Sequence, residues 1–93
     1  MSRVIERIIN RIKALAFSEV FDVNKDAILI QLFSEFGRQY VAIYHQTKDD
    51  SICFETWEVE DVDFDALKNR IAEEFMHWVV IPDNLNGTIL IYQ

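Results

Sequence analysis

The chain is poor in cysteine, proline and glycine. Its 93 residues include one cysteine, one proline and two glycines. A single cysteine excludes an intrachain disulfide and favours a reducing compartment, so we expect a cytoplasmic protein. Few glycines and prolines leave no room for long flexible linkers, and 51% hydrophobic residues are enough to bury one core. The sequence therefore predicts a single domain over residues 1–93.

Long hydrophobic runs are absent as well. No stretch of about 18 apolar residues exists to cross a bilayer, so we expect no membrane contact. The opening segment, MSRVIERIINRIKALAF, is amphipathic and is interrupted by Glu6, Arg7 and Arg11, which is unlike a secretory signal. An organelle transit peptide, which is also amphipathic and Arg-rich, stays open as an alternative. We expect the mature chain to begin at Met1.

Sequence motifs of catalysis are also missing. The chain has no G-x-S-x-G, no glycine-rich phosphate loop and no dinucleotide fingerprint. Cys53 lies in the apolar context ICFE, which predicts an inert, buried thiol. His45 and His77 have no partner at metal-ligand spacing. His45 and Glu55 could form an acid–base pair across neighbouring strands, but any antiparallel meander supplies such pairs, so this is not a specific sign of catalysis. We expect a non-enzymatic protein with no cofactor and no metal.

Negative charge is abundant and unevenly placed. Residues 1–18 hold four basic residues and one acidic residue, whereas residues 49–83 hold eleven acidic residues and two basic ones. The net charge of −7 repels nucleic acid and attracts basic surfaces, so we expect no direct binding of DNA or RNA. The acidic residues that we predict to bind a partner are Asp49, Asp50, Glu55, Glu58, Glu60, Asp61, Asp63, Asp65, Glu73 and Glu74.

Other roles for these carboxylates stay open. Asp61, Asp63 and Asp65 match the first three ligand positions of an EF-hand calcium loop, but the required glycine and glutamate are replaced by Ala66 and Ala72. Asp63 or Asp65 is expected to cap a helix, where carboxylates accept unpaired N–H groups and oppose the helix dipole. The remaining carboxylates could form a solvated surface, an unspecific cation site or a docking surface. Trp57, which lies among them in the sequence, could be a core residue or an interface anchor.

Hydrophobic spacing predicts the fold. Residues 4–17 and 64–78 repeat apolar side chains at steps of three and four, which is typical of amphipathic helices. Between them AILIQLFS, YVAIYH and ICFETWEV read as strands, with a turn at Gly37, and TILIY reads as a last strand. The four residues before Pro82, WVVI, fit helix or strand. We predict an α+β two-layer sandwich, with an antiparallel sheet of about four to five strands and two helices on one face. Its helix core residues would be Ile8, Ile12, Leu15, Phe64, Leu67, Ile71 and Phe75.

Size and acidity suggest a functional class. In length, in charge and in the acidic run from Glu55 to Asp65, followed by Glu73 and Glu74, the chain resembles small DNA-mimic proteins that phages use as anti-restriction factors or inhibitors of host enzymes. That resemblance implies an inhibitor whose carboxylates occupy a basic surface of a partner protein, such as a nucleic-acid-binding enzyme, in place of phosphates. The Arg-bearing first helix departs from an all-acidic mimic.

Two alternatives remain at this point. The chain could be an adaptor or complex subunit that binds through an apolar helix or sheet face, including as a homodimer. It could also hold a small molecule or cation against the sheet. The salt dependence of partner binding distinguishes the acidic inhibitor from the adaptor. Exposed charges are screened within about 8–10 Å near physiological ionic strength, so binding through the acidic surface should weaken as salt rises, whereas binding through an apolar face should survive.

Overall fold

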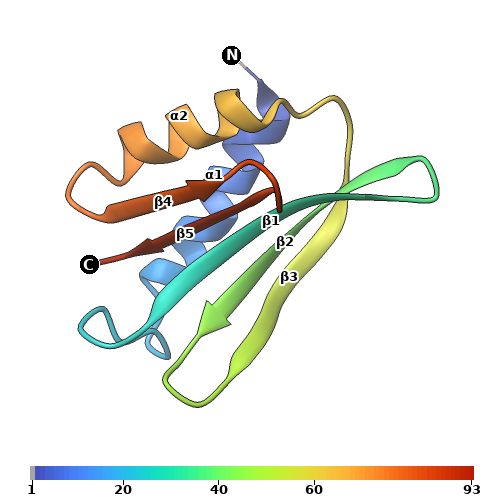
Figure 1. The fold of residues 1–93 in the computed structure, drawn as a ribbon. Coiled ribbons are helices and arrows are strands. Elements are labelled where there is room, and N and C mark those ends of the chain that lie inside the picture. The colour runs from blue at the N-terminus through green and yellow to red at the C-terminus, as the bar shows by residue number, and fades with distance from the viewer. Residues whose placement is uncertain (1) are drawn as a thin grey trace.

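The computed structural model describes residues 2–93 and has two layers, one of helices and one of sheet (Figure 1). Five strands form one antiparallel sheet in the order β3-β2-β1-β5-β4, so β1 is the central strand. Both helices lie on the same side of it, which confirms the predicted α+β two-layer sandwich. In chain order the elements are α1 (Arg3–Ala16), β1 (Ala27–Glu35), β2 (Arg38–Gln46), β3 (Ser51–Val59), α2 (Phe64–Glu74), β4 (Val79–Asp83) and β5 (Thr88–Tyr92).

Helix α1 begins where the chain supplies a cap. The Ser2 hydroxyl accepts a hydrogen bond from the Ile5 amide at 3.2 Å, which satisfies one of the unpaired N–H groups of the first turn. The apolar stripe of α1 then faces the sheet, with its isoleucines and Leu15 almost fully buried. Burial of this stripe, rather than intrinsic helix propensity, supplies most of the stability of a helix of this length.

Helix α2 is fixed at its start by two different residues. The Asp63 carboxylate accepts from the Ala66 amide at 3.0 Å, so Asp63 is the cap, and Asp65 lies inside the first turn. The Gln39 side chain of β2 accepts from Val62 N–H at 2.9 Å and donates to Val62 C=O at 3.0 Å. Together these contacts hold the β3–α2 connection against the sheet. The helix core matches the prediction, except that Phe64 is only half-buried.

The strands are joined by tight turns. Glu35 pairs with Arg38 across the two-residue turn Phe36-Gly37, in which both residues have positive φ, as primed hairpin turns require. The segment WVVI, left undecided by the sequence, begins the edge strand β4 at Val79. Pro82 is tolerated there because an edge strand pairs on one side only.

Candidate protein-interaction surfaces

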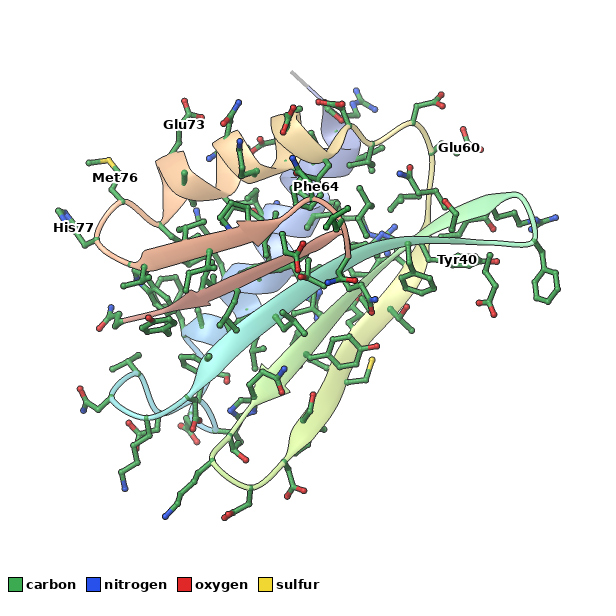
Figure 2. The ribbon with its side chains drawn as sticks, in the orientation of Figure 1. Tyr40, Glu60, Phe64, Glu73, Met76 and His77 are labelled. Atoms are coloured by element: carbon green, nitrogen blue, oxygen red, sulfur yellow. The ribbon has the colours of Figure 1, made fainter. Side chains whose placement is uncertain are left out.

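One side of the sheet carries no helix. Residues paired across an antiparallel sheet share a face, and successive residues of a strand alternate between faces. On β1, Ile28 and Ile30 are buried under the helices, so Leu29, Gln31 and Phe33 point to the opposite side. We call that side the open face; Figure 2 looks onto it, with α1 behind the sheet.

The open face has an apolar row that crosses every strand. Leu29 on the central strand pairs with Tyr44 on one side and Leu90 on the other, and these pair in turn with Cys53 and Ile81. We call these five residues the apolar row. At about 4.8 Å between strands the row is roughly 19 Å long. Ile81 is 46% exposed, and Leu29, Tyr44 and Leu90 are partly exposed.

Aromatic side chains extend this surface. Phe33 and Tyr40 pair across β1 and β2 with their rings stacked, centroid to centroid 5.5 Å. At the opposite end of the face Tyr92 pairs with Val79, which is 43% exposed. Aromatic residues are enriched in protein interfaces because they bury a large area at low entropic cost. The open face thus has the composition of a contact surface.

Polar and charged side chains of the open face lie beside the apolar row or at its margins. The neighbouring row, also crossing all strands, contains Thr56, Ala42, Gln31, Thr88 and Asp83. The charged residues are Glu35 and Asp83 at strand ends and the ion pair Arg38–Glu58 near the edge strand β3. An apolar centre with a polar margin is the usual anatomy of a protein–protein interface.

The prediction that Cys53 is buried is wrong: its side chain is exposed, on the open face. Val59, Trp57 and Glu55 point to the helix side, and strict alternation would put Cys53 there too. A register shift between Ile43 and Tyr44 inserts Phe54 as an extra residue in β3, and this bulge turns Cys53 to the other side. A bulge of this kind leaves no signature in the sequence that reading by periodicity can detect.

Half of the ten acidic residues predicted to bind a partner are engaged within the chain. Glu55 pairs with Arg11 at 2.6 Å, Glu58 with Arg38 at 3.2 Å, and Asp65 with Lys68 at 3.6 Å. Glu74 pairs with Lys13 and Arg70, both at 2.9 Å, and Asp63 caps α2. The Lys13 ammonium, and then Arg70, lower the pKa of Glu74. Glu55 and Glu58 also point to opposite sides of the sheet, because three positions separate them.

The other five acidic residues are spread around the margin. Within residues 2–93, no ion pair involves Asp49, Asp50, Glu60, Asp61 or Glu73. Asp49 and Asp50 lie in the β2–β3 turn, whereas Glu60 and Asp61 follow the far end of β3, which is roughly 26 Å long at about 3.3 Å per residue. Glu73 projects from α2 (Figure 2). These acidic residues therefore lie in separate groups and do not form one continuous acidic surface.

The cations of α1 turn back onto the protein. Arg11 and Lys13 make the ion pairs just described, and the Arg7 guanidinium lies over the Trp57 ring, 4.9 Å from its centroid. Trp57 packs against the core and is partly buried, in line with its reading as a core residue. The basic charge of α1 is thus used largely within the chain.

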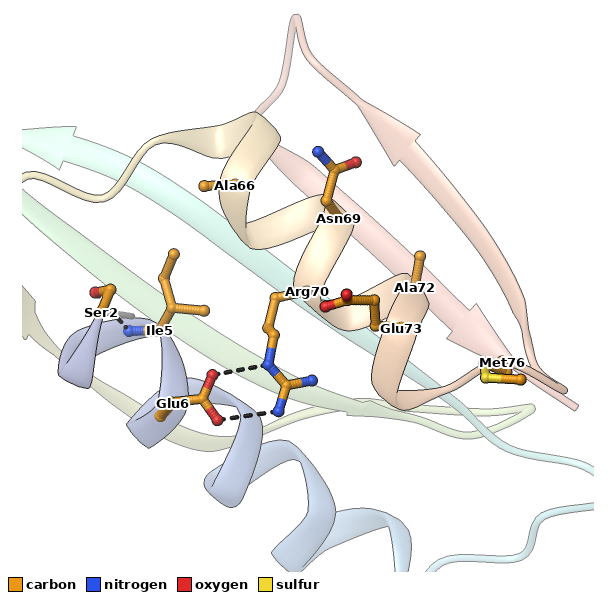
Figure 3. Close-up of a pocket in the computed structure, with 9 residues that line it drawn as sticks. All are labelled: Ser2, Ile5, Glu6, Ala66, Asn69, Arg70, Ala72, Glu73 and Met76. Atoms are coloured by element: carbon orange, nitrogen blue, oxygen red, sulfur yellow. Dashed lines mark hydrogen bonds and ion pairs between the residues drawn. The ribbon is translucent and has the colours of Figure 1, made fainter.

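A groove of about 880 Å³ runs between the outer surfaces of α1 and α2 (Figure 3). Its floor includes Ile5, and small residues such as Ala66 and Ala72 line the α2 side. Arg70 donates to both carboxylate oxygens of Glu6, at 2.7 and 3.0 Å, and closes part of the groove. The pKa of Arg70 is raised, chiefly by the hydrogen bonds to Glu6 and then to Glu74. This arginine is occupied and is not poised to bind an anion.

His45 has a partner that the sequence did not reveal. Its Nε2 lies 2.7 Å from Asp26 Oδ2, and both side chains are buried. The ionised carboxylate only accepts, so Nε2 carries the proton and donates. Asp26 also accepts from the Asp22 amide at 2.9 Å, and the pair thereby ties the α1–β1 connection to β2. Val41, Ile43 and His45 alternate along β2, and this spacing was the available signal that His45 faces the core.

We predict that Asp26 supports stability in a pH-dependent way. The hydrogen bond from the Asp22 backbone, and then that from His45, lower the pKa of Asp26. A depressed folded-state pKa gives stabilisation that is present above the unfolded pKa, about 3.9, and is lost as pH falls through the folded value. Asp26→Asn should lower the free energy of unfolding by about 1.5–3 kcal/mol at neutral pH, the range for hydrogen bonds to charged groups.

Urea titrations from pH 7 to pH 3 measure this effect. The difference between the native protein and Asp26→Asn should shrink towards acid. Asp49→Asn, at an exposed turn position, is the control and should show no such trend. A difference that stays constant with pH, or a control that behaves like Asp26→Asn, would contradict the assigned role.

Within residues 2–93 no group of three or more His, Cys, Asp or Glu side chains is arranged to hold a metal ion. None of the helices in the described part of the chain combines the length and the apolar character needed to cross a bilayer. No protein family, curated protein or solved structure matches the chain.

Sequence reasoning offered binding through an apolar helix or sheet face only as the alternative to the acidic surface, and it did not identify the residues of the open face. Its signal is nevertheless present, since AILIQLF, YVAIY and TILIY are apolar on both alternating sets of positions. Antiparallel strands with one wet face normally alternate apolar and polar residues, whereas continuous apolar runs belong to strands covered on both sides. With only two helices available, both on one side, the second apolar face of the sheet is left uncovered.

Proposed function

We propose that this chain is a non-enzymatic protein-interaction module, an adaptor or complex subunit, and that the open face of its sheet is its docking surface. The observation that carries the proposal is the apolar row crossing all five strands on the side without helices. Contiguous exposed apolar surface with a polar margin marks interaction sites, because exposing it to water is unfavourable unless a partner covers it.

The acidic groups and the groove between the helices are less suited to binding a partner than the open face. The acidic groups lie apart from one another, and half of them are engaged in ion pairs or a helix cap. The groove between the helices is narrowed by the Glu6–Arg70 pair. On the open face, by contrast, Tyr44 and Leu90 are partly exposed and Ile81 is 46% exposed, and no helix covers them.

A pair of matched charge variants tests the docking surface. Tyr44→Lys with Leu90→Lys adds two charges to the open face, and Asn69→Lys with Ala72→Lys adds two on the helix side. Affinity capture with the native chain should retain a stoichiometric partner, which the helix-side variant also retains. The open-face variant should weaken binding of that partner, once purified, by at least about 30-fold, since charging the centre of an interface costs more than about 2 kcal/mol.

Circular dichroism and thermal melting of both variants provide the folding control. Equal binding by the native chain and a folded open-face variant would refute the proposal. Loss of binding in the helix-side variant alone would move the docking surface to the groove between α1 and α2.

A second candidate function is the acidic inhibitor that occupies a basic, nucleic-acid-binding surface of a partner. What favours it is that Glu60, Asp61 and Glu73 make no ion pair within residues 2–93, so their charge is available to a cationic surface. Negative charge at phosphate-like spacing would compete for a basic groove. This binding would be lost as salt rises, whereas apolar docking would survive.

The second candidate predicts that Glu58→Gln, Glu60→Gln and Asp61→Asn together abolish partner binding and leave stability equal or slightly raised. Each change keeps the size of the side chain and removes one of several neighbouring like charges. Titrations of the partner at two salt concentrations measure the effect. If the open face is the docking surface, the triple variant should bind within about threefold of the native chain, because charges at the margin of an interface contribute little.

We also propose a cytoplasmic location for the protein. A single free thiol, exposed on the open face, fits a reducing compartment, where it stays unoxidised.

A further inference from the structure

We propose that the partner covering the open face is a second copy of this chain, so that the protein is a dimer of two sheets packed face to face. This inference rests on the proposed function, because it names the partner of the same surface. It is carried by the area of the face, by the placement of charge and by the central position of the apolar row.

The area of the face is sufficient for a dimer. Three strands of nine residues and two of five make up the sheet. With about 4.8 Å between strands and about 3.3 Å per residue, the face projects to roughly 600 Å². Two copies would bury about 1,200 Å² together, the lower bound of stable, specific interfaces. Side-chain relief adds to this projected value.

Charge placement permits self-association in spite of the net charge of −7. Two copies with carboxylates in the middle of the contact would repel each other. The apolar row has no ionised carboxylate or amine, and Glu35, Glu58 and Asp83 lie at strand ends or on the edge strand β3. A centre without charge offers nothing for selective recognition of a basic or acidic foreign partner, and it brings no like charges together when it meets its own copy.

The apolar row also suits two-fold symmetry. In an isologous contact the same patch of each copy meets its counterpart across a two-fold axis, and a patch in the middle of the face allows the two faces to overlap over most of their area. Leu29 lies on the middle strand, with two members of the row on each side. Two such faces pack about 10 Å apart with interdigitated side chains, as in a sandwich of two sheets. The helices then form the two outer layers of a four-layer particle.

Sedimentation equilibrium over a wide concentration range tests the dimer with the intact chain. The native protein should have twice the mass of the chain and dissociate on dilution. Ile81→Lys and Leu90→Lys, each of which occurs twice per dimer, should raise the dissociation constant of the dimer by at least about 100-fold. Ala72→Lys, on the helix side, should leave it within about threefold. Ile81 is 46% exposed on an edge strand, so its substitution does not threaten folding.

Cys53 supplies a second readout that needs no loss of structure. It is the single cysteine of the chain, and it ends the apolar row. The rate of its reaction with a soluble thiol reagent should fall at least about tenfold between concentrations well below the dissociation constant and concentrations about 100-fold above it, because only the monomer exposes the thiol. The same concentration series with Ile81→Lys should show a constant, fast rate.

The outcomes separate this inference from the proposed function. A native protein that stays monomeric at every concentration, with a constant thiol rate, overturns the dimer. The docking surface still stands if the Tyr44→Lys and Leu90→Lys variant loses a different partner. A dimer that survives Ile81→Lys and Leu90→Lys but is lost in Ala72→Lys overturns the face-to-face arrangement. If charging the open face changes neither self-association nor partner binding, both proposals fall.

Discussion

Ile30→Ala should lower the free energy of unfolding by about 2–5 kcal/mol, whereas Leu29→Ala, one position earlier on the same strand, should lower it by about 1 kcal/mol or less. Ile30 is 1% exposed beneath the helices, and its truncation leaves a cavity in close-packed surroundings. Leu29 is only half-buried on the open face, where water or repacking fills the space. The contrast follows from the face that each side chain occupies.

Urea or thermal unfolding measures both values. The comparison is made in the Ile81→Lys background, so that self-association does not add to the apparent stability. Equal and large losses at both positions would show that the open face is covered within the folded chain. That result would remove the basis for an interaction surface there. Equal and small losses would contradict the assignment of Ile30 to the core.

Gly87→Ala should be about as damaging as Ile30→Ala and lower the free energy of unfolding by about 2–5 kcal/mol, while Gly37→Ala should lower it by about 1–2 kcal/mol. Both glycines have positive φ, +65° and +74°, where an added Cβ costs about 1–2 kcal/mol. At Gly87 the Cβ would also collide with the backbone oxygen of Leu32. Relieving that collision breaks the hydrogen bond from Leu32 N–H to Gly87 C=O, for about 1–3 kcal/mol more.

Gly37 is the matched control because it has the same backbone conformation and no atom within 4 Å of the place that an added Cβ would occupy. The two variants thus differ only in the close approach at Gly87. Melting temperatures and urea midpoints of both, with the native protein, give the difference. If Gly37→Ala were as destabilising as Gly87→Ala, conformational strain alone would account for both, and the contact between β1 and the β4–β5 turn would be of little importance.

Sequence periodicity predicted most of the fold because each element has a clear pattern. Ile8, Ile12 and Leu15 recur at helical spacing and are all buried, and the strands around Gly37 lie where turn chemistry placed them. The segment before Pro82 stayed ambiguous, since a short apolar run fits helix or strand until its pairing partner is known. Pairing with β5 at the sheet edge decides it.

The interaction surface was harder to predict than the fold. The acidic run that begins at Glu55 was predicted to bind a partner because charge can be read directly from a sequence. The pairing of Glu55 with Arg11 and of Glu74 with Lys13, in contrast, depends on contacts between residues distant in the chain. The predicted burial of Cys53 was wrong because a single bulge in β3 reverses the side to which its side chain points. The open face was encoded in the two-sided apolar strands, but only the layer arrangement shows which side the helices leave bare.

Methyl NMR of the native protein distinguishes docking on the open face from docking elsewhere, because Leu29, Leu90 and Ile81 carry methyl groups on the open face while Leu67 and Ile71 of α2 carry them in the buried core. As protein concentration rises, or as the captured partner is added, the open-face methyl resonances should shift together, and those of Leu67 and Ile71 should stay in place. Shifts confined to Ile5 and Met76 in the groove, with Leu29, Leu90 and Ile81 unchanged, would show that binding does not involve the open face.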